Sequence, residues 1–290
     1  MSEQDLLRRF LFEDIGVRGL WVKLSASWQA ARQHQHCPEN MQLQLGQALS
    51  AVVLLSSTIK FDGSMILQAQ GDGALKLLVA QATHDRKIRG LIKGEGPVNT
   101  DSLQEMFGEA RLVLTITSEA AKPYQGIVPL QGNNLAAMLE TYFSQSEQLN
   151  TRLWLFADQT KAAGLLLQEL PAKLKDNEDW ERIVLLADTV TAPEMLDLDC
   201  EDLLYRLFNE EQVRLFAGEP VVFDCSCSRT KIENALRMLG RPELESVLLE
   251  RGNIDVNCEF CNKYYGFDKV DVEQLLCAEQ VMPANTNIRH

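Results

Sequence analysis

Hydrophobic and polar residues alternate with a period of two along much of the first 170 positions, which predicts β-strands. Residues 1–24 are expected to form two short strands. Further strands are predicted around Met65–Ala69, Leu75–Val79, Ile88–Ile92, Leu112–Ile116, Tyr124–Leu130, Leu153–Phe156 and Gly164–Leu170. Gly71-Asp72-Gly73 is expected to form the turn of a hairpin between two of these strands.

Other segments follow a helical period. From about Met41 to Ile59 the chain is apolar around much of a helix surface, which indicates a buried core helix, and residues 26–37 also favour a helix. A further helix is predicted from the i, i+3, i+4, i+7, i+8 spacing of Leu135, Met138, Leu139, Tyr142 and Phe143. Asn133 or Asn134 is its expected N-cap. Strand hairpins broken by long helices are typical of the α+β class, so residues 1–175 are predicted to be an α+β core domain.

The character of the chain changes after about residue 175. Residues 176–219 hold 13 acidic and 3 basic side chains, whereas residues 1–175 hold 17 of each. Apolar residues form one helical stripe before Pro193 and another after it, at Ile183, Leu186 and Val190 and at Leu203, Leu204, Leu207 and Phe208. Short amphipathic helices of high like charge repel one another and depend on packing against a neighbour. Residues 176–220 are therefore predicted to be a metastable helical linker.

Four of the seven cysteines lie in two close pairs, Cys225-Ser226-Cys227 and Cys258-Glu259-Phe260-Cys261. Two such pairs can present four thiolates in a tetrahedron, which is the arrangement that structural zinc prefers. No histidine lies between the pairs, and four sulfur ligands leave no open position for a catalytic water. The sequence therefore predicts one zinc ion bound by Cys225, Cys227, Cys258 and Cys261. The alternative is a set of buried or disulfide-paired cysteines.

The zinc ligands are expected to lie in a small C-terminal domain, residues 221–290. The apolar spacing predicts a helix over Ile232–Leu239, with Ser228 as its N-cap and Gly240 as its end, and a second helix that begins at Pro242. A module of this size has a marginal core of its own. Zinc binding contributes on the order of 10–16 kcal/mol to the folding of such modules, so metal removal is expected to unfold it.

The composition places the chain in a broad class. Hydrophobic residues make up 46% and charged residues 24%, as in ordinary globular proteins. The acidic start at Met1–Asp5 differs from a signal peptide, and no apolar run approaches the roughly 18 residues of a membrane helix. These features predict a cytoplasmic protein without a membrane partner. In that compartment thiols stay reduced and tend to bind metals or to act in redox chemistry.

Enzymatic sites are not indicated. The sequence has four histidines and lacks the Gly-x-Ser-x-Gly and His-Glu-x-x-His motifs of hydrolases. His34, His36 and Cys37 lie close together, but a polar turn before Pro38 explains them more simply than a metal site. The chain is therefore predicted not to be an enzyme.

Two other functions fit a zinc module. A zinc ribbon that binds nucleic acid needs a basic face, whereas residues 221–276 hold 10 acidic and 7 basic side chains, and the net charge of the chain is −13. No nucleic-acid partner is therefore expected. A thiol oxidoreductase that uses Cys225 and Cys227 as a dithiol is the second alternative, and it would differ from a switch by catalytic turnover.

The cysteine pattern near the end of a chain of this length resembles the heat-shock protein 33 family of redox-regulated bacterial chaperones, also called 33 kDa chaperonins. Further stretches similar to that family are Arg18-Gly19, Lys60-Phe61-Asp62-Gly63, Gln70-Gly71-Asp72-Gly73, Tyr124-Gln125-Gly126 and Ser146-Glu147-Gln148-Leu149. The resemblance covers essentially the whole chain. It implies an α+β domain, a metastable linker, a zinc switch, and holding of unfolding proteins without ATP. No role is transferred to Cys37, Cys200 or Cys277.

The residues and the resemblance together suggest a redox mechanism. Zinc-bound thiolates react with oxidants, and the resulting sulfenic acids condense with neighbouring thiols. The expected disulfides are Cys225–Cys227 and Cys258–Cys261, since near neighbours have the highest effective concentration, and the resemblance implies the same pairing. Zinc would then leave, the switch and linker would unfold, and apolar surface would become accessible to unfolded client proteins. A homodimer of the oxidised form is also expected from the resemblance.

Overall fold

The computed structural model describes residues 3–96, 98–118, 121–129, 132, 134–170 and 177–277. The chain divides into two compact units, Met1–Asp224 and Cys225–His290. Helices and strands are mixed in both units, and the predicted α+β class is confirmed. The predicted domain boundaries at 175/176 and 220/221 stay a prediction, and the units are described separately.

The first sheet of the N-terminal unit is antiparallel and has the strand order β10-β1-β2-β9-β8, with β11 also paired to β1. Its strands are β1 (Leu6–Phe12), β2 (Val17–Leu24), β8 (Thr151–Ala157), β9 (Ala162–Glu169), β10 (Val213–Leu215) and β11 (Glu219–Pro220). The four longer strands were all predicted from alternation. The two short ones come from the segment just before the cysteines, so this segment is tied to the edge of the sheet.

The second sheet has the order β12-β5-β4-β3-β6-β7, in which only the short pair β12 and β5 is parallel among the described pairs. Its strands are β3 (Gly63–Gly71), β4 (Leu75–Thr83), β5 (Lys87–Gly94), β6 (Ala110–Ser118), β7 (Ala121–Pro129) and β12 (Val222–Phe223). The turn between β3 and β4 packs against helix α3 (Leu103–Phe107). A Cβ on Gly73 would lie 2.4 Å from the Met106 carbonyl oxygen, so this close approach requires glycine.

The alternation in β4 differs from the prediction. Unbroken alternation in the predicted strand Leu75–Val79 would place Leu77 and Val79 on the same face as Leu75, but the buried residues are Leu75, Leu78, Ala80 and Ala82. The register against β5 shifts between Leu75 and Leu77. A bulge at this point moves all later side chains to the opposite face, because strand side chains have a period of two.

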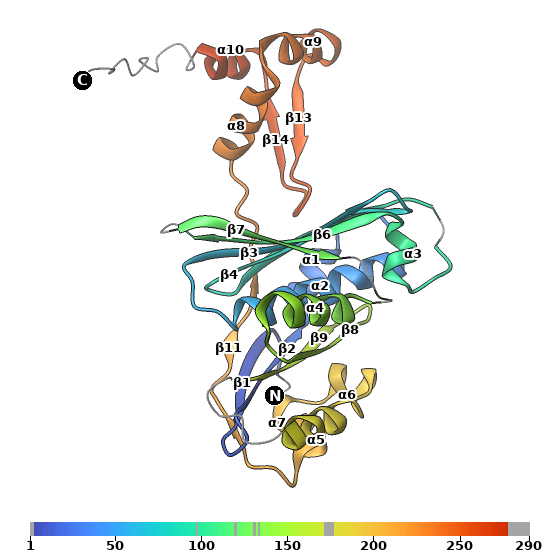
Figure 1. Cartoon of the computed structure of the whole chain (residues 1–290). Helices are drawn as coiled ribbons and strands as arrows, with labels where there is room; N and C mark the ends of the chain where they lie inside the picture. Colours follow the sequence, from blue (N-terminus) through green and yellow to red (C-terminus); the bar gives the residue numbers. More distant parts are fainter. Residues whose placement is uncertain are drawn as a thin grey trace, which may run out of the picture. The chain divides into compact units, whose positions relative to one another are not determined.

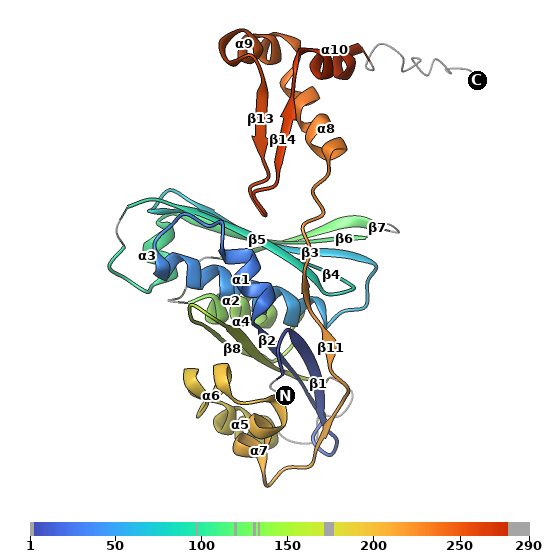
Figure 2. The same ribbon diagram turned by 180° about the vertical axis from the view of Figure 1, so that it is seen from behind.

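Three helices lie between the two sheets, α1 (Ala26–Arg32), α2 (Glu39–Ser56) and α4 (Leu135–Tyr142), as Figures 1 and 2 show from opposite sides. Helix α2 is buried almost all round from Leu45 onward, which confirms the predicted core helix and explains its apolar surface. The Asn134 side chain accepts a hydrogen bond from the Ala137 N–H at 2.9 Å and caps α4. Asn133 lies outside the described residues. Helix α4 continues into a π-helical turn, η1 (Phe143–Glu147).

The acidic segment forms three helices that cover the other face of the first sheet: α5 (Asn177–Ala187), α6 (Ala192–Asp197) and α7 (Cys200–Phe208). Both predicted stripes pack into a second core together with Phe10, Phe12, Trp21 and Leu165. Pro193 lies in the first turn of α6, which proline tolerates because it has no N–H to satisfy there. The packing neighbour of the acidic helices is therefore the face of this sheet.

Basic and polar groups of the sheet bind the acidic segment directly. Lys23 is 2% exposed, donates to the Leu198 carbonyl at 2.5 Å and lies 3.8 Å from Asp199. The Glu3 carboxylate accepts from the Cys200 N–H at 2.9 Å and so occupies the positive end of α7. Further pairs join Arg8 to Glu201, Arg152 to Asp188 and Lys161 to Asp197. Part of the negative charge of the segment is thus balanced by the core domain.

The C-terminal unit consists of α8 (Arg229–Leu239), α9 (Arg241–Arg251), the hairpin β13 (Ile254–Asn257) and β14 (Tyr264–Phe267), and α10 (Lys269–Cys277). Ser228 caps α8 by accepting from the Lys231 N–H at 3.2 Å, as predicted. Gly240 ends α8 with a positive φ of 83°, and Pro242 lies in the first turn of α9. The hairpin and α10 were not predicted.

Phe208 offers a test of how firmly α7 is docked. Its ring lies 5.0 Å from Phe12 and 6.5 Å from Phe10, between ring centroids. Phe208→Ala should lower the free energy of unfolding of this segment by about 3 kcal/mol, because a large buried side chain is lost. Hydrogen exchange of the reduced protein would show faster exchange in α5 to α7. Tyr205→Ala, on the same helix but 74% exposed, should change little, and an equal effect of both variants would contradict the packing.

Candidate metal centre

Four cysteines from two parts of the sequence converge in the C-terminal unit. Cys225 and Cys227 lie in the segment that leads into α8, and Cys258 and Cys261 lie in the turn between β13 and β14. All four Sγ atoms are within 4.8 Å of one another. The Sγ atoms of Cys225 and Cys258 are 3.6 Å apart, and those of Cys227 and Cys261 are 3.5 Å apart.

This arrangement fits a tetrahedral metal site. Sulfur atoms around one zinc ion, at bonds of about 2.3 Å, form a tetrahedron with edges of about 3.8 Å. The observed separations are close to that edge, and all four ligand atoms are sulfur, which zinc accepts readily. The sequence prediction therefore named the four residues that the fold brings together.

Local hydrogen bonds shape the two cysteine loops. The Lys231 ammonium donates to the Ser226 carbonyl at 2.7 Å and to its Oγ at 3.1 Å, which fixes the turn between the first two cysteines. In the second loop the Cys258 N–H donates to the Lys263 carbonyl at 2.9 Å, and the Asn262 N–H donates to the Cys258 carbonyl at 2.7 Å. Asn262 has a φ of 56°, a left-handed conformation that asparagine tolerates better than most residues.

The thiols differ in their tendency to ionise. Burial, with hydrogen bonds among the thiols, raises the pKa of Cys225 to about 12. Burial also opposes ionisation of Cys227, but hydrogen bonds from Tyr265 and the other thiols outweigh it and lower the pKa to about 7. The Tyr265 hydroxyl donates to the Cys227 Sγ at 3.2 Å. Without a metal the cluster thus favours one thiolate, whereas a bound dication would stabilise all four.

Tyr265 was not found by sequence reasoning, and nothing in its position pointed to it. It lies on β14, four residues after Cys261, and is 7% exposed. Its hydroxyl reaches Cys227 only because β14 folds back beside the first cysteine loop, a contact between residues 38 positions apart. Hydrogen bonds to a ligand sulfur tune its basicity, so Tyr265 supports the centre without being a ligand.

The cysteines are also part of the small core of this unit. Cys258 is buried with eight other residues, namely Leu236, Leu244, Ile254, Tyr265, Phe267, Val272, Leu275 and Leu276, and the other three cysteines pack against them. The Arg229 guanidinium lies 4.4 Å from the Phe267 ring centroid and pairs with Asp271 at 2.8 Å. Metal centre and apolar core therefore share one structure.

Two cysteines outside the cluster, Cys37 and Cys200, show no sign of reactivity. Burial raises the pKa of Cys37 to about 11 and raises that of the buried Cys200 further. Both thiols are therefore poor nucleophiles at neutral pH. The side chain of Cys277 lies outside the described residues. His34 and His36, near Cys37, belong to no group of potential metal ligands among the residues that the structure describes.

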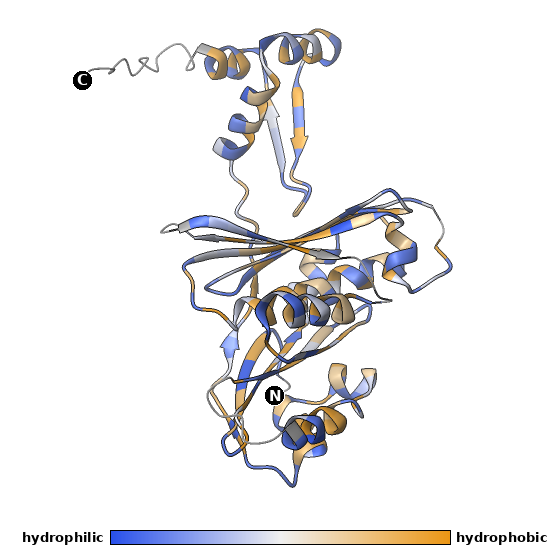
Figure 3. Cartoon of the chain, viewed as in Figure 1, coloured by the Kyte–Doolittle hydropathy of each residue, from blue (hydrophilic) through white to orange (hydrophobic). Residues whose placement is uncertain are grey.

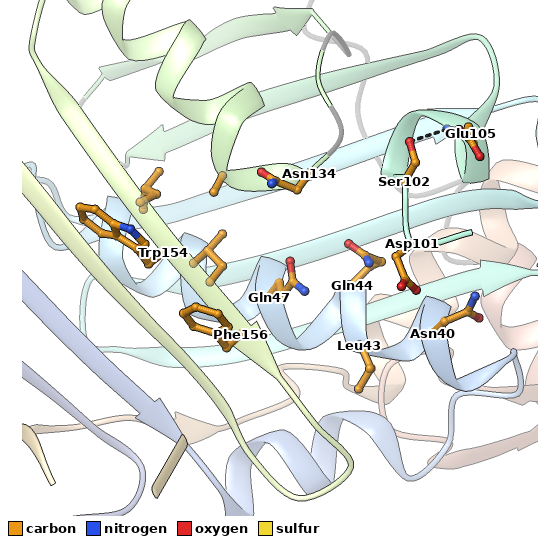
Figure 4. A pocket seen from close by; sticks show the side chains of 13 residues that line it. Asn40, Leu43, Gln44, Gln47, Asp101, Ser102, Glu105, Asn134, Trp154 and Phe156 are labelled. Carbon is orange, nitrogen blue, oxygen red and sulfur yellow. Dashed lines mark hydrogen bonds between the residues drawn. The ribbon is translucent and has the colours of Figure 1, made fainter. Parts of the chain in front are cut away.

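The core domain contains a cavity of 750 Å³ between α2, α3, α4 and β8, which Figure 4 shows from close by. Its lining is mainly amide, carboxyl and apolar, and Ser102 there is used to cap α3. Neither histidine nor cysteine lines it, among the described residues. In the described part of the chain, no helix has the length and apolarity to cross a membrane.

Comparison with known proteins agrees with this structure. The sequence model of the Hsp33 protein family matches residues 5–268. The 33 kDa chaperonin of Nitrosococcus oceani is 58% identical over 290 residues and that of Methylobacillus flagellatus 45% identical over 294 residues, each with full coverage of both chains. A crystal structure of the 33 kDa chaperonin from Thermotoga maritima has a TM-score of 0.82 and 25% identity, covering 95% of this chain and 99% of that one.

Both bacterial relatives are named 33 kDa chaperonins. Chaperonins are not enzymes, which agrees with the prediction that the chain has no enzymatic activity. The resemblance stated from sequence motifs is confirmed along the whole chain. The chain belongs to the Hsp33 family.

Proposed function

We propose that this protein is a redox-regulated holdase that works without ATP and prevents aggregation of unfolding proteins under oxidative stress. In the inactive reduced form, Cys225, Cys227, Cys258 and Cys261 hold one zinc ion. The observation that carries the proposal is the four-thiol cluster inside a small core, supported by membership of a chaperone family. When bound, zinc supplies charge that keeps the thiols ionised and a cross-link that holds the two loops together.

Oxidation changes what these residues can bind. Two thiolates lose two electrons and form one S–S bond, through a sulfenic acid, while a peroxide accepts the electrons and is reduced to water. Disulfide sulfurs are poor zinc ligands, so the ion leaves. The unit then loses binding energy on the order of 10–16 kcal/mol, which its small core cannot replace.

The proposed disulfides join Cys225 to Cys227 and Cys258 to Cys261. In the reduced fold close sulfur contacts also run between the motifs, at 3.6 Å from Cys225 to Cys258 and at 3.5 Å from Cys227 to Cys261. We propose pairing within each motif nonetheless, because its two cysteines are separated by only one or two residues and so keep the highest effective concentration as the loops move during oxidation. A bond across one intervening residue is strained and therefore easily reduced, as a reversible switch requires.

The covalent path from the switch to the acidic helices runs through β10, β11 and β12. These short strands connect α7 to Cys225 and are paired to β1 and β5 by a few residues each. When the C-terminal unit unfolds, the anchor beyond Asp224 is lost. We propose that β12, β11 and β10 then detach in turn, and that α5 to α7 loosen with them.

Release of these helices would expose two apolar surfaces. One is the face of the first sheet around Phe10, Phe12 and Trp21, and the other is the inner side of α7 with Leu203 and Leu207. In Figure 3 the ribbons of β1 and α7 each carry both hydrophobic and hydrophilic residues along their length. Such surfaces bind unfolded client chains, and a second copy of the oxidised chain could cover part of them as a homodimer.

The remaining context follows from the same chemistry. A thiol switch needs a compartment where cysteines are normally reduced, so we place the protein in the cytoplasm. The acidic C-terminal half offers no basic surface for nucleic acid. Client proteins are bound through their exposed apolar segments and are not chemically changed, so no catalytic turnover is expected.

The first prediction concerns the metal. Purified reduced protein should contain one zinc per chain, and Cys258→Ser should lose most of it, because three thiolates hold the ion less well than four. Elemental analysis and a zinc-release assay measure this. Cys37→Ser is the matched control and should keep full zinc content. Full occupancy in the Cys258→Ser protein would refute the four-thiolate site.

The second prediction concerns disulfide pairing. After peroxide treatment, peptide mass mapping should find Cys225 joined to Cys227 and Cys258 joined to Cys261. The oxidised protein should also fail to catalyse insulin reduction by a thiol donor, since it is a switch. A dominant link between the motifs, such as Cys225 to Cys258, whose sulfurs lie 3.6 Å apart in the reduced fold, would contradict pairing within each motif.

The third prediction concerns the acidic helices. Oxidation should abolish hydrogen-exchange protection in residues 225–277 and in α5 to α7, while β3 to β6 stay protected. Suppression of client aggregation should rise in parallel and need no nucleotide. A chain that ends before Val221 should be partly active even when reduced, because β12 and its anchor are missing. If chaperone activity appears while α5 to α7 stay protected from hydrogen exchange, the proposed exposure of apolar surface by their release is wrong.

A further inference from the structure

The inner face of the first sheet carries a charge where strand alternation calls for an apolar residue. Leu20, Val22 and Leu24 of β2 point into the main core, and Arg18 occupies the same face. Arg18 forms no ion pair with any described residue, and burial, with the nearby Arg9, lowers its pKa. A half-buried charge without a partner is costly, so such a group is rarely retained for packing alone.

A polar ladder across three strands holds this guanidinium. Arg18 on β2 lies opposite Gln168 on β9, and Gln168 lies opposite Thr151 on β8. The Nε and Nη2 of Arg18 donate to the Gln168 Oε1, and the Gln168 Nε2 donates to the Thr151 Oγ1 at 2.8 Å. Gln168 is 1% exposed. This leaves the Nη1–Nη2 edge of Arg18 free, which is the edge that binds a carboxylate with two hydrogen bonds.

Arg18 lines a cavity of 280 Å³ with mostly apolar walls. The walls come from the end of α2, from β3 and β6, and from α4 with η1, and include Leu55, Ile59, Met65, Leu114, Ile116 and Phe143. Tyr124 and Tyr142 contribute two hydroxyl groups, which are hydrogen-bonded to each other with 2.9 Å between their oxygen atoms. The volume is just below the roughly 300–1,000 Å³ of typical ligand pockets.

Three of the sequence stretches that carry the family resemblance meet at this cavity. They contribute Arg18, Tyr124, and both Glu147 and Leu149. Gly126, in the second stretch, leaves room for the Tyr142 ring, because a Cβ there would lie 2.3 Å from the Tyr142 hydroxyl oxygen and the ring would have to shift. None of these residues belongs to the metal centre or to its core. The redox switch therefore leaves this part of the sequence unexplained.

We propose that this cavity binds a small amphipathic carboxylate, such as a medium-chain fatty acid. The carboxylate lies on the free edge of Arg18, and the hydrocarbon chain lies against the apolar walls. The single positive charge of the guanidinium matches the single negative charge of a carboxylate, whereas a phosphate dianion would need further cations. Glu147 is the one acidic residue among the described residues of the lining; it is exposed and screened by water, and it forms no ion pair with Arg18.

The experiment uses the full-length, reduced, zinc-loaded protein, so that its result does not depend on the proposed switch. Octanoate and octanol are titrated separately below their aggregation limits by calorimetry. Octanoate should bind with one equivalent and at least about tenfold more tightly than octanol, because only the acid gains charge-assisted hydrogen bonds. The Arg18 Nε–H resonance should shift on addition of octanoate.

Variants separate the charge from the cavity. Arg18→Gln should weaken octanoate about tenfold and leave octanol unchanged, because it removes the cation alone. Ile116→Phe should weaken both ligands, because it fills the cavity. Arg111→Gln is the matched control, since Arg111 is exposed on β6 outside this cavity, and it should bind like wild type. If Arg18→Gln fails to fold, the wild-type comparison of acid and alcohol still decides.

Several outcomes would overturn the proposal. These are equal affinity for octanoate and octanol, unchanged octanoate binding in Arg18→Gln, binding of several equivalents as to a detergent-like surface, or no saturable binding. A final arm compares an N-acetylated apolar hexapeptide as free acid and as amide. If the free acid alone binds, and more tightly than octanoate, the cavity recognises chain termini of polypeptides and the small-molecule assignment is wrong.

Discussion

Four cysteine sulfurs within 4.8 Å of one another are the constraint on which the C-terminal unit depends. Its core has nine buried residues, one of them Cys258, and several large apolar side chains remain on the surface, with Met238 and Leu249 each 89% exposed. Burial of this extent stabilises a domain only weakly once the loss of chain entropy is included. A metal bound by both cysteine loops would supply the missing stability, and any chemistry that removes the sulfur ligands would remove this stability.

In the acidic helices, apolar packing on the first sheet works against the repulsion between like charges. Their apolar sides pack on the first sheet, and Arg8, Lys23, Arg152 and Lys161 offset part of their charge. Most of these pairs are partly exposed, for example Glu201 at 74% and Asp197 at 70%, and such pairs contribute about 0–1 kcal/mol each. The docked state is thus held mainly by apolar contacts and opposed by self-repulsion. This gives a segment that is ordered and yet releasable.

Local signals in the sequence predicted what depends on local physics. Helix α2, the caps at Asn134 and Ser228, and the four cysteines were all predicted from spacing and residue type. The bulge in β4 could not be predicted, because it arises from pairing with β5. The surface that receives the acidic helices also depends on contacts between residues far apart in sequence, as does the position of Tyr265 beside Cys227. Arg18 could be read as part of a strand, but only the sheet places its guanidinium beside Gln168 and an apolar cavity.

The short strands between α7 and Cys225 connect the acidic helices on the first sheet to the C-terminal unit that holds the four cysteines. β12 has two paired residues with β5, β11 has two with β1, and β10 has three with β1. Each backbone hydrogen bond contributes about 1 kcal/mol net, so the attachment is weak and can open from the end nearest the cysteines. A stronger connection would keep α5 to α7 docked after the zinc unit unfolded, and a missing one would leave them free in the reduced state. In the proposed mechanism, short pairing along this segment would let a change at four sulfur atoms reach the apolar face of the sheet.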